Sequence, residues 1–208
     1  MNRQIRKSIL SDAESFIEIK NQLSFKTENN ESISGGFLLG TDLDTYKEFI
    51  KNSYCLTALV NRNIIGFGIA FNNKTLRNSE IWEKRKSASW HIDLLKLEQE
   101  NIAYFEQLAF VKGHKLLAIQ LAYNLVRIGF NKGASTFMTT TVNKPIKNLA
   151  AVPFINASKG ILAGNINEFY PIIGEINSDI YMIKKEDFYK ELEKVSYKDL
   201  LIKSHINY

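Results

Sequence analysis

Glu106 is the residue of this sequence best placed to carry out acid–base chemistry. It is the only charged residue between Ile102 and Val111, in a run otherwise made of apolar, aromatic and amide side chains. Burial in such a run raises the pKa of a carboxyl group, because it disfavours the charged form, and a base that works near neutral pH needs that shift. The pattern leaves open that Glu106 is instead paired inside the core or points to a polar rim.

A short basic segment after Glu106 predicts an anion site. Val111-Lys112-Gly113-His114 joins the apolar run to Lys115, where a helical period begins. The first N–H groups of a helix have no partner within it and favour anions. Lys112, His114 and Lys115 would add positive charge beside them. The alternative is a basic turn that binds nothing.

Other chemistries find little support. Cys55 is the only cysteine, which excludes an internal disulfide and a cysteine-built metal cluster. His91, His114 and His205 show no metal-ligand spacing, and the sequence has no glycine–lysine phosphate loop. We therefore expect no metal site, and we expect Cys55 to be inert in the core.

Length and composition suit one globular domain. The 208 residues are 45% hydrophobic and 24% charged, so we expect a single domain over residues 1–208, with an insertion at 72–100 and a helical tail at 185–208. The formal charge of +5 comes from lysines interleaved with acids, which indicates a solvated surface rather than a nucleic-acid stripe. No window approaches the ~20 apolar residues of a membrane span. We expect a cytoplasmic protein without a nucleic-acid or membrane partner.

The element that must position Glu106 is a strand at 102–111 that turns into a long apolar helix from Lys115 to about Asn131. A strand at 135–142 follows and predicts a right-handed parallel crossover. The sequence predicts further strands at 4–9, 55–60, 64–71, 161–166 and 178–183, and helices at about 11–23, 42–53, 79–87, 149–157 and 185–203. Segment 72–100 either covers the active face as a lid or forms an insertion with its own apolar cluster.

This order of elements resembles the GNAT superfamily of acyl-CoA N-acyltransferases over roughly residues 4 to 184. Locally, Glu106-Gln107-Leu108-Ala109-Phe110 looks like the family's fourth strand, and Asn131-Lys132-Gly133-Ala134 resembles the end of the helix that follows it. Further matches are Asn148, Ala151, Phe154, Gly160, Tyr170 and Asp179-Ile180-Tyr181-Met182. The resemblance implies an α/β fold with a mixed, largely antiparallel central sheet of about seven strands, helices on both faces and the parallel crossover at 102–142.

The resemblance also implies an activity, the transfer of an acetyl or other short acyl group from acetyl-CoA or another acyl-CoA to an amine. Glu106 is then the catalytic base. A tyrosine often protonates the leaving thiolate in the family, but the matching position lies near Ile155, so Tyr181 or Tyr170 is the candidate, although each is also suited to be an ordinary core or surface tyrosine. The implied cofactor-binding residues are Leu108, Phe110, Lys112, Gly113, His114, Lys115, Leu116, Leu117, Ala118 and Asn148.

The sequence departs from the family's pattern in the pyrophosphate loop. Leu116 stands where relatives carry a glycine, and the turn is about two residues shorter. The implied acceptor is a small-molecule or peptide amine, and a homodimer is left open. A protein of this fold that binds acyl-CoA or another ligand without catalysis is the main alternative, and a basic nucleic-acid-binding module is the third.

Overall fold

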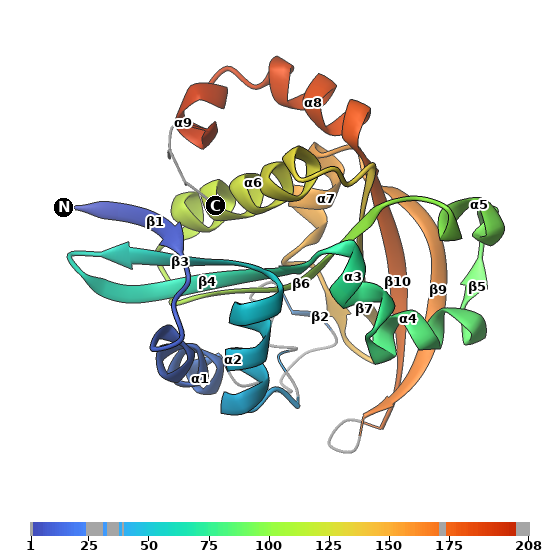
Figure 1. Cartoon of the computed structure of the whole chain (residues 1–208), viewed down its shortest axis with the longest axis horizontal. Coiled ribbons are helices and arrows are strands. Elements are labelled where there is room, and N and C mark those ends of the chain that lie inside the picture. The colour runs from blue at the N-terminus through green and yellow to red at the C-terminus, as the bar shows by residue number, and fades with distance from the viewer. Residues whose placement is uncertain (1, 24–30, 33–37, 39, 171–173, 203–208) are drawn as a thin grey trace.

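A crossover from β6 (Ile102–Phe110) through α6 (Lys115–Asn131) to β7 (Thr136–Lys144) forms the centre of the fold (Figure 1). The structure is a computed structural model that describes residues 2–23, 31–32, 38, 40–170 and 174–202. β6 and β7 pair in parallel, as the spacing predicts. α6 is apolar around most of its circumference because it is covered on several sides, and nearly all residues of its last three turns are buried.

The main sheet is mixed and largely antiparallel, which confirms the predicted fold class. Seven long strands and the two-residue β5 make up this sheet in the part of the chain that the structure describes, and β6–β7 is its one parallel pair. In spatial order the strands are β1 (Arg3–Lys7), β3 (Tyr54–Val60), β4 (Asn63–Phe71), β6, β7, β10 (Gly174–Lys184), β9 (Ile161–Tyr170) and β5 (Ser89–Trp90). A separate parallel pair joins β2 (Glu31–Ser32) to β8 (Lys147–Asn148).

Helices cover both faces of the sheet (Figure 1). One face, here called the α6 face, carries α6, α7 (Val152–Ala157), α8 (Lys185–Lys194) and α9 (Lys198–Ile202). The opposite face, here called the α1 face, carries α1 (Asp12–Gln22), α2 (Leu43–Asn52), α3 (Asn73–Arg77), α4 (Glu80–Lys84), the 3₁₀ turn η1 (Arg85–Ser87) and α5 (Leu94–Glu98). Each face has its own buried core cluster.

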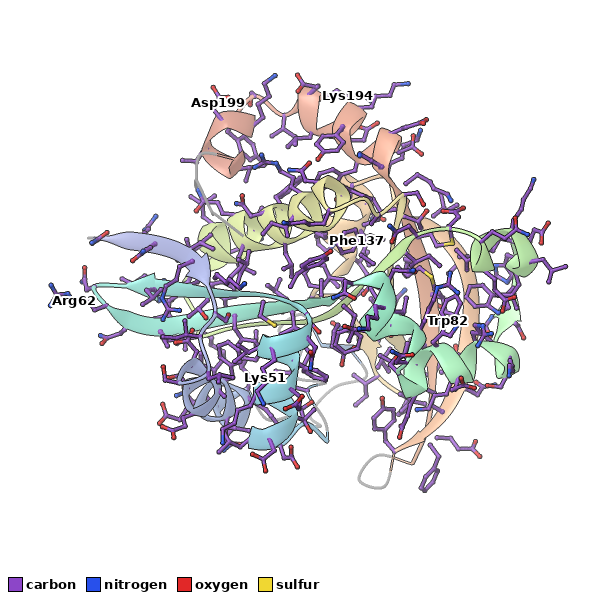
Figure 2. The ribbon with its side chains drawn as sticks, in the orientation of Figure 1. Lys51, Arg62, Trp82, Phe137, Lys194 and Asp199 are labelled. Atoms are coloured by element: carbon purple, nitrogen blue, oxygen red, sulfur yellow. The ribbon has the colours of Figure 1, made fainter. Side chains whose placement is uncertain are left out.

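Small residues let α6 lie close to the sheet. A Cβ built on Gly68 of β4 would lie 2.4 Å from Leu121 Cδ2, and one built on Gly129 of α6 would lie 2.4 Å from Cε2 of Phe137, which is labelled in Figure 2. Neither site leaves room for a side chain. The glycines therefore fix the distance between the helix and the strands it crosses.

Local signals set several element ends. The β3–β4 hairpin turns through Asn61 and Arg62, both with positive φ, which suits a two-residue loop. The sequence predicts Thr41 or Asp42 as the cap of α2, and Asp42 is the cap, since it accepts the Thr45 N–H at 2.8 Å. The spacing of Ser11 and Glu14 predicts a capping box at the start of α1. That prediction is wrong, because the Ser11 side chain makes no cap bond and the buried Asp12 carboxylate accepts the Ile9 N–H there instead.

Three expected elements differ from the structure in extent. The helix expected from Leu149 begins only at Val152, because Lys147–Asn148 pairs with β2. The tail is two helices instead of one, interrupted at 195–197. Segment 72–100 folds into α3, α4, η1, β5 and α5. Its Leu76, Trp82 and Leu97 join the core cluster of the α1 face, so the segment does not form an apolar cluster of its own.

No helix in the described part of the chain is long and apolar enough to cross a membrane.

Candidate active site

β6 and β7 pair only at their beginnings. The parallel register runs over Ile102, Ala103 and Tyr104 of β6, and then the two strands separate although each continues for six more residues. Beyond that point, within the described chain, the β7 side of β6 meets only the Thr139 hydroxyl, which donates to the Phe105 carbonyl at 3.1 Å. The backbone groups of β6 that face β7 beyond Phe105 are thus left for another partner, while the opposite side of the strand pairs with β4.

A β-bulge lies at Glu106. In the pairing of β6 with β4, Ile69 lies opposite Gln107 and Ala70 lies opposite Phe105, so Glu106 is the extra residue. Phe105 packs on the α6 face, whereas Gln107 bonds to Tyr46 of α2 on the α1 face. Because a bulge interrupts the alternation of side chains, Glu106 and Gln107 both face the α1 side. A regular strand would place them on opposite faces.

Glu106 has the electrostatics of a base that titrates near neutral pH. It lies deep among protein atoms, and yet part of its side chain stays accessible to solvent. Burial, opposed by a hydrogen bond from Gln107 and reinforced by the nearby carboxylate of Glu168, raises its pKa to about 7. Glu106 in turn raises the pKa of Tyr46 and of Tyr104, whose shifts come mainly from their own burial.

A chain of hydrogen bonds fixes the residue beside Glu106. Tyr46 Oη donates to Gln107 Oε1 at 3.0 Å, and Gln107 Nε2 donates to Thr41 Oγ1 at 3.0 Å. All three side chains are buried. The chain links α2 to the bulge and determines the orientation of the Gln107 amide. Sequence patterns did not identify Tyr46 or Thr41 as site residues, since both read as ordinary residues of a helix and its start.

Strand β9 brings two further polar side chains to the α1 face. Ile166 of β9 belongs to the core cluster of that face, and Glu168 and Tyr170 follow at the same parity. Burial, Glu168 and Glu106 raise the pKa of Tyr170, an effect that Lys84 opposes. Glu168 was not predicted, although its spacing of two residues from Tyr170 is a signal that the two share a face.

The predicted anion site has the backbone geometry of a helix start. Gly113 has φ +94°, a conformation that favours glycine, and α6 begins two residues later. Ala118 donates to the His114 carbonyl at 3.0 Å, while among the described residues nothing accepts from the N–H groups of Lys115, Leu116 and Leu117.

The side chains of this turn leave the N–H groups accessible. Lys112 and Lys115 are exposed, and Leu116 is 40% exposed, so its bulk projects outward although it stands where relatives have glycine. Leu117 is buried in the core and Ala118 is half-buried. The site fits a phosphate-bearing cofactor through three free N–H donors with basic residues around them.

The other residues proposed for the cofactor fall on the α6 face or at its edge. Leu108 is 39% exposed, and Phe110 packs against the core of that face. Asn148 does not cap α7, because its side-chain oxygen accepts the Ala150 N–H at 3.1 Å and the cap position is Ala151. Ile155, at the position of the family's tyrosine, is 1% exposed.

Tyr181 does not share a face with Glu106. Its neighbours Ile180 and Met182 belong to the core cluster of the α1 face, so Tyr181 points to the α6 face. Burial, followed by the neighbouring carboxylate of Asp179, raises the pKa of Tyr181. The structure therefore places Glu106 and Tyr181, the two predicted catalytic residues, on opposite faces of the sheet. The gap between β6 and β7 separates the strands that carry them.

A hollow with a volume of about 590 Å³ lies between α1 and the start of α2. Its lining includes Glu14, Glu18 and Asp42, with Lys20 as the one basic residue among the described ones. Thr41, which bonds to Gln107, also borders it. The glycine-containing segment 35–40 is too apolar to be only a linker, which predicts a loop that lines the acceptor pocket, but it lies mostly outside the described residues.

No group of three potential metal ligands gathers anywhere in the described chain.

Comparison with solved structures identifies the fold. No protein-family model matches the sequence, and a search of curated proteins finds no match. An acetyltransferase of the GNAT family from Streptococcus pneumoniae superposes with a TM-score of 0.57 at 14% identity, over 88% of this chain and 99% of that one. The protein yncA from Salmonella typhimurium, solved with its cofactor acetyl-CoA, gives 0.59 at 10% identity, over 88% and 94%.

The ribosomal-protein-S18-alanine N-acetyltransferase from Escherichia coli gives a TM-score of 0.58 at 12% identity, over 88% of this chain and 94% of that one. All three similarities extend over 88% of this chain. The chain has the fold of the GNAT N-acetyltransferases.

Proposed function

We propose that this protein transfers an acetyl or other short acyl group from acyl-CoA to an amine, with Glu106 as the general base. The observation that carries the proposal is the bulge that turns Glu106 to the α1 face, beside the point where β6 and β7 separate. A pKa of about 7 lets this carboxylate accept a proton at neutral pH and release it again.

The cofactor fits the α6 face of this chain. The N–H groups of Lys115, Leu116 and Leu117 would hold its pyrophosphate, with Lys112 and His114 beside them, and the unpaired edge of β6 would hold its pantetheine arm. When bound, acyl-CoA supplies the acyl group as a thioester. The elongated gap between β6 and β7 supports this arrangement, because it leaves strand groups near Glu106 free to bond.

The chain's own groups divide the proton transfers. Glu106 on the α1 face takes the proton that the attacking amine loses, and Gln107, fixed by Tyr46 and Thr41, positions that carboxylate. On the α6 face the Tyr181 hydroxyl is our candidate proton donor. Its raised pKa keeps it protonated at neutral pH, which a donor requires.

A second function is favoured by Ile155, which is 1% exposed and stands at the position that the resemblance gives to the proton-donating tyrosine. A site that keeps the anion-binding helix start without that donor suits a protein that binds the cofactor and does not turn it over. Such a protein would bind acyl-CoA or a related ligand without turnover.

One experiment separates the two. Acetyl-CoA is titrated into the protein by calorimetry, and free CoA is then measured with a thiol reagent during incubation with a panel of amines. Cys55 is 1% exposed, and burial raises its pKa, so the protein's own thiol contributes little signal. Binding with amine-dependent release supports the transferase, binding without release supports the ligand-binding protein, and no binding at millimolar acetyl-CoA excludes both.

A further inference from the structure

An ion pair joins the insertion to the candidate active site. Lys84, the last residue of α4, places its Nζ 2.8 Å from Glu168 Oε1 on β9. The two residues are separated by 84 positions in the sequence. The Glu168 carboxylate contributes to the raised pKa values of Glu106, Tyr104 and Tyr170. Lys84 is therefore paired with a carboxylate that influences the proposed base.

The two partners are held very differently. The Glu168 side chain is 14% exposed and its backbone is paired with Ile176 of β10, whereas the Lys84 side chain is 45% exposed. Several contacts hold the segment that carries Lys84. The guanidinium carbons of Arg77 and Arg85 lie 4.6 and 4.5 Å from the centroid of the Trp82 ring, and Arg85 Nε pairs with Glu98 Oε1 at 2.7 Å. Glu168 is thus a fixed carboxylate, and Lys84 is a long side chain that can leave it.

Around Glu106 and Glu168, the described residues contribute more acidic groups than basic ones. Glu106 and Glu168 contribute carboxylates, and Tyr46, Tyr104 and Tyr170 contribute neutral hydroxyls. Lys84 is the cation that acts on this group. Glu80 of α4 also acts on Lys84 and adds a further negative charge at the rim. Once an amine has given its proton to Glu106, Glu168 still attracts a cation.

We propose that Glu168 is a specificity-determining residue and that it selects an acceptor with a second cationic group, which binds Glu168 in place of Lys84. The inference rests on the proposed amine acylation. An acceptor such as a diamine would present one nitrogen to Glu106 and the other to Glu168. An amine that carries a carboxylate would meet repulsion from both glutamates.

The first test compares three acceptors of one length on the unmodified protein: diaminobutane, butylamine and aminobutanoate. Steady-state CoA release should give a kcat/KM for diaminobutane about tenfold above that for butylamine, because the acceptor's second ammonium takes over the bond to Glu168 while the half-exposed Lys84 ammonium returns to water. Aminobutanoate should be the poorest substrate. Calorimetry without cofactor should show the same order of binding.

Two variants assign the effect to this ion pair. Glu168→Gln keeps the shape and removes the charge, so it should reduce the preference for diaminobutane to within about threefold of butylamine. The readout is the ratio of the two acceptors in the same variant, so that a change in the pKa of Glu106, on which Glu168 also acts, affects both acceptors alike. Lys84→Met removes the competing cation and should lower the KM for diaminobutane alone. Glu175→Gln, an exposed change on the neighbouring strand β10, is the matched control and should leave all three acceptors unchanged.

The outcomes distinguish this inference from the function it rests on. Equal kcat/KM for diaminobutane and butylamine, or a preference for aminobutanoate, overturns the inference and leaves the acylation of amines intact. Should no amine be acylated, the transferase proposal fails, and binding of diaminobutane that is lost in Glu168→Gln would still support the site. Absence of that binding as well would overturn both. Should Glu168→Gln not fold, the three-acceptor comparison and Lys84→Met decide.

Discussion

The proposed chemistry of this protein depends on one extra residue in a strand. The bulge in β6 turns Glu106 and Gln107 to the same face, so an ionisable carboxylate lies beside an amide that is already fixed by two hydrogen bonds. Without the extra residue, one of these side chains would point into the core under α6. Burial is the main reason that the pKa of Glu106 is raised to about 7.

Glu106→Gln should lower the acyl-transfer rate by roughly 10²–10⁴-fold, because it keeps the shape of the side chain and removes the proton acceptor. In the unmodified protein the rate should fall as pH drops below about 7, where Glu106 becomes protonated, and this acidic limb should vanish in the variant. Initial rates from pH 6 to 9 at subsaturating amine, corrected for ionisation of the amine, test both points.

Stability gives an independent check with a defined sign. The pKa of Glu106 is raised on folding from 4.5 to about 7, so the unfolded chain loses this proton first and the free energy of unfolding falls as pH rises through that window. Glu106→Gln should lack this loss. A flat rate profile in the unmodified protein would remove Glu106 from the mechanism, and Glu83→Gln, an exposed change on α4, should alter neither measurement.

Among the elements, α1 depends on a buried carboxylate at its first residue. Asp12 is 2% exposed and accepts bonds from both Arg6 nitrogens at 2.6 and 2.8 Å, from the Thr57 hydroxyl at 2.7 Å and from the Ile9 N–H. Burial acts to raise the pKa of Asp12, but these bonds outweigh it and hold the pKa below its ordinary value. One residue thereby ties α1 to β1 and β3.

Asp12→Ala should reduce the free energy of unfolding by about 3 kcal/mol or more, because it leaves a partly buried guanidinium without its partner. The contribution of Asp12 is present above its unfolded pKa near 3.8 and is lost as pH falls through the lower folded value, so the variant should differ less from the parent in acid. Urea unfolding at pH 7 and pH 3 measures this. Glu14→Ala, an exposed change in the same turn, should cost less than about 0.5 kcal/mol.

The two ends of α6 offer a matched pair for the cofactor site. Lys115→Glu reverses a charge beside the free N–H groups and should weaken acetyl-CoA binding roughly tenfold, since it opposes the anion preference of the helix start. Lys132→Glu reverses an exposed charge just beyond the other end of the same helix and should leave affinity unchanged. Calorimetric titration compares them, and equal loss in both variants would contradict pyrophosphate binding at this turn.

The sequence could predict elements whose signal is local, and it could not predict contacts between distant ones. The apolar run at 102–110 and the helical period after Lys115 were enough to predict the crossover, and the same run singles out Glu106 as an isolated charge, whose catalytic role stays a prediction. The bulge leaves no such signal, because it appears only in the pairing with Ile69 and Ala70. Lys84 and Glu168 meet across 84 positions, and only the completed sheet brings them together.

For the molecule as a whole, the tail closes the core of the α6 face. Phe188 of α8 is fully buried, with ring centroids 5.6 Å from Tyr123 and 5.4 Å from Phe130. Gln120 and Asn124 of α6 donate to carbonyls of α9 at 2.8 and 3.0 Å. In Figure 1 these two last helices arch over α6. The tail is therefore a structural part of the fold.

Phe188→Ala should lower the free energy of unfolding by about 3–5 kcal/mol, since it removes a large buried ring and leaves a cavity against α6. Leu200→Ala, at a side chain that is 46% exposed, should cost little and serves as the control. Thermal and urea unfolding of the two variants measure the difference. If Phe188→Ala and Leu200→Ala lowered the free energy of unfolding equally, the buried Phe188 ring would have no special part in holding α8 and α9 on α6.

The strand order has a consequence for how the chain is made. β9 is synthesised before β10, but β10 lies between it and β7, so β9 has only the two-residue β5 to pair with until β10 has left the ribosome. During that interval a nascent chain exposes the bare edge of β7, which invites pairing with other chains. Glu168 and Tyr170 reach Glu106 only when β10 inserts. The two carboxylates therefore come together only after β10 has been made, although Glu106 and Glu168 both precede β10 in the chain.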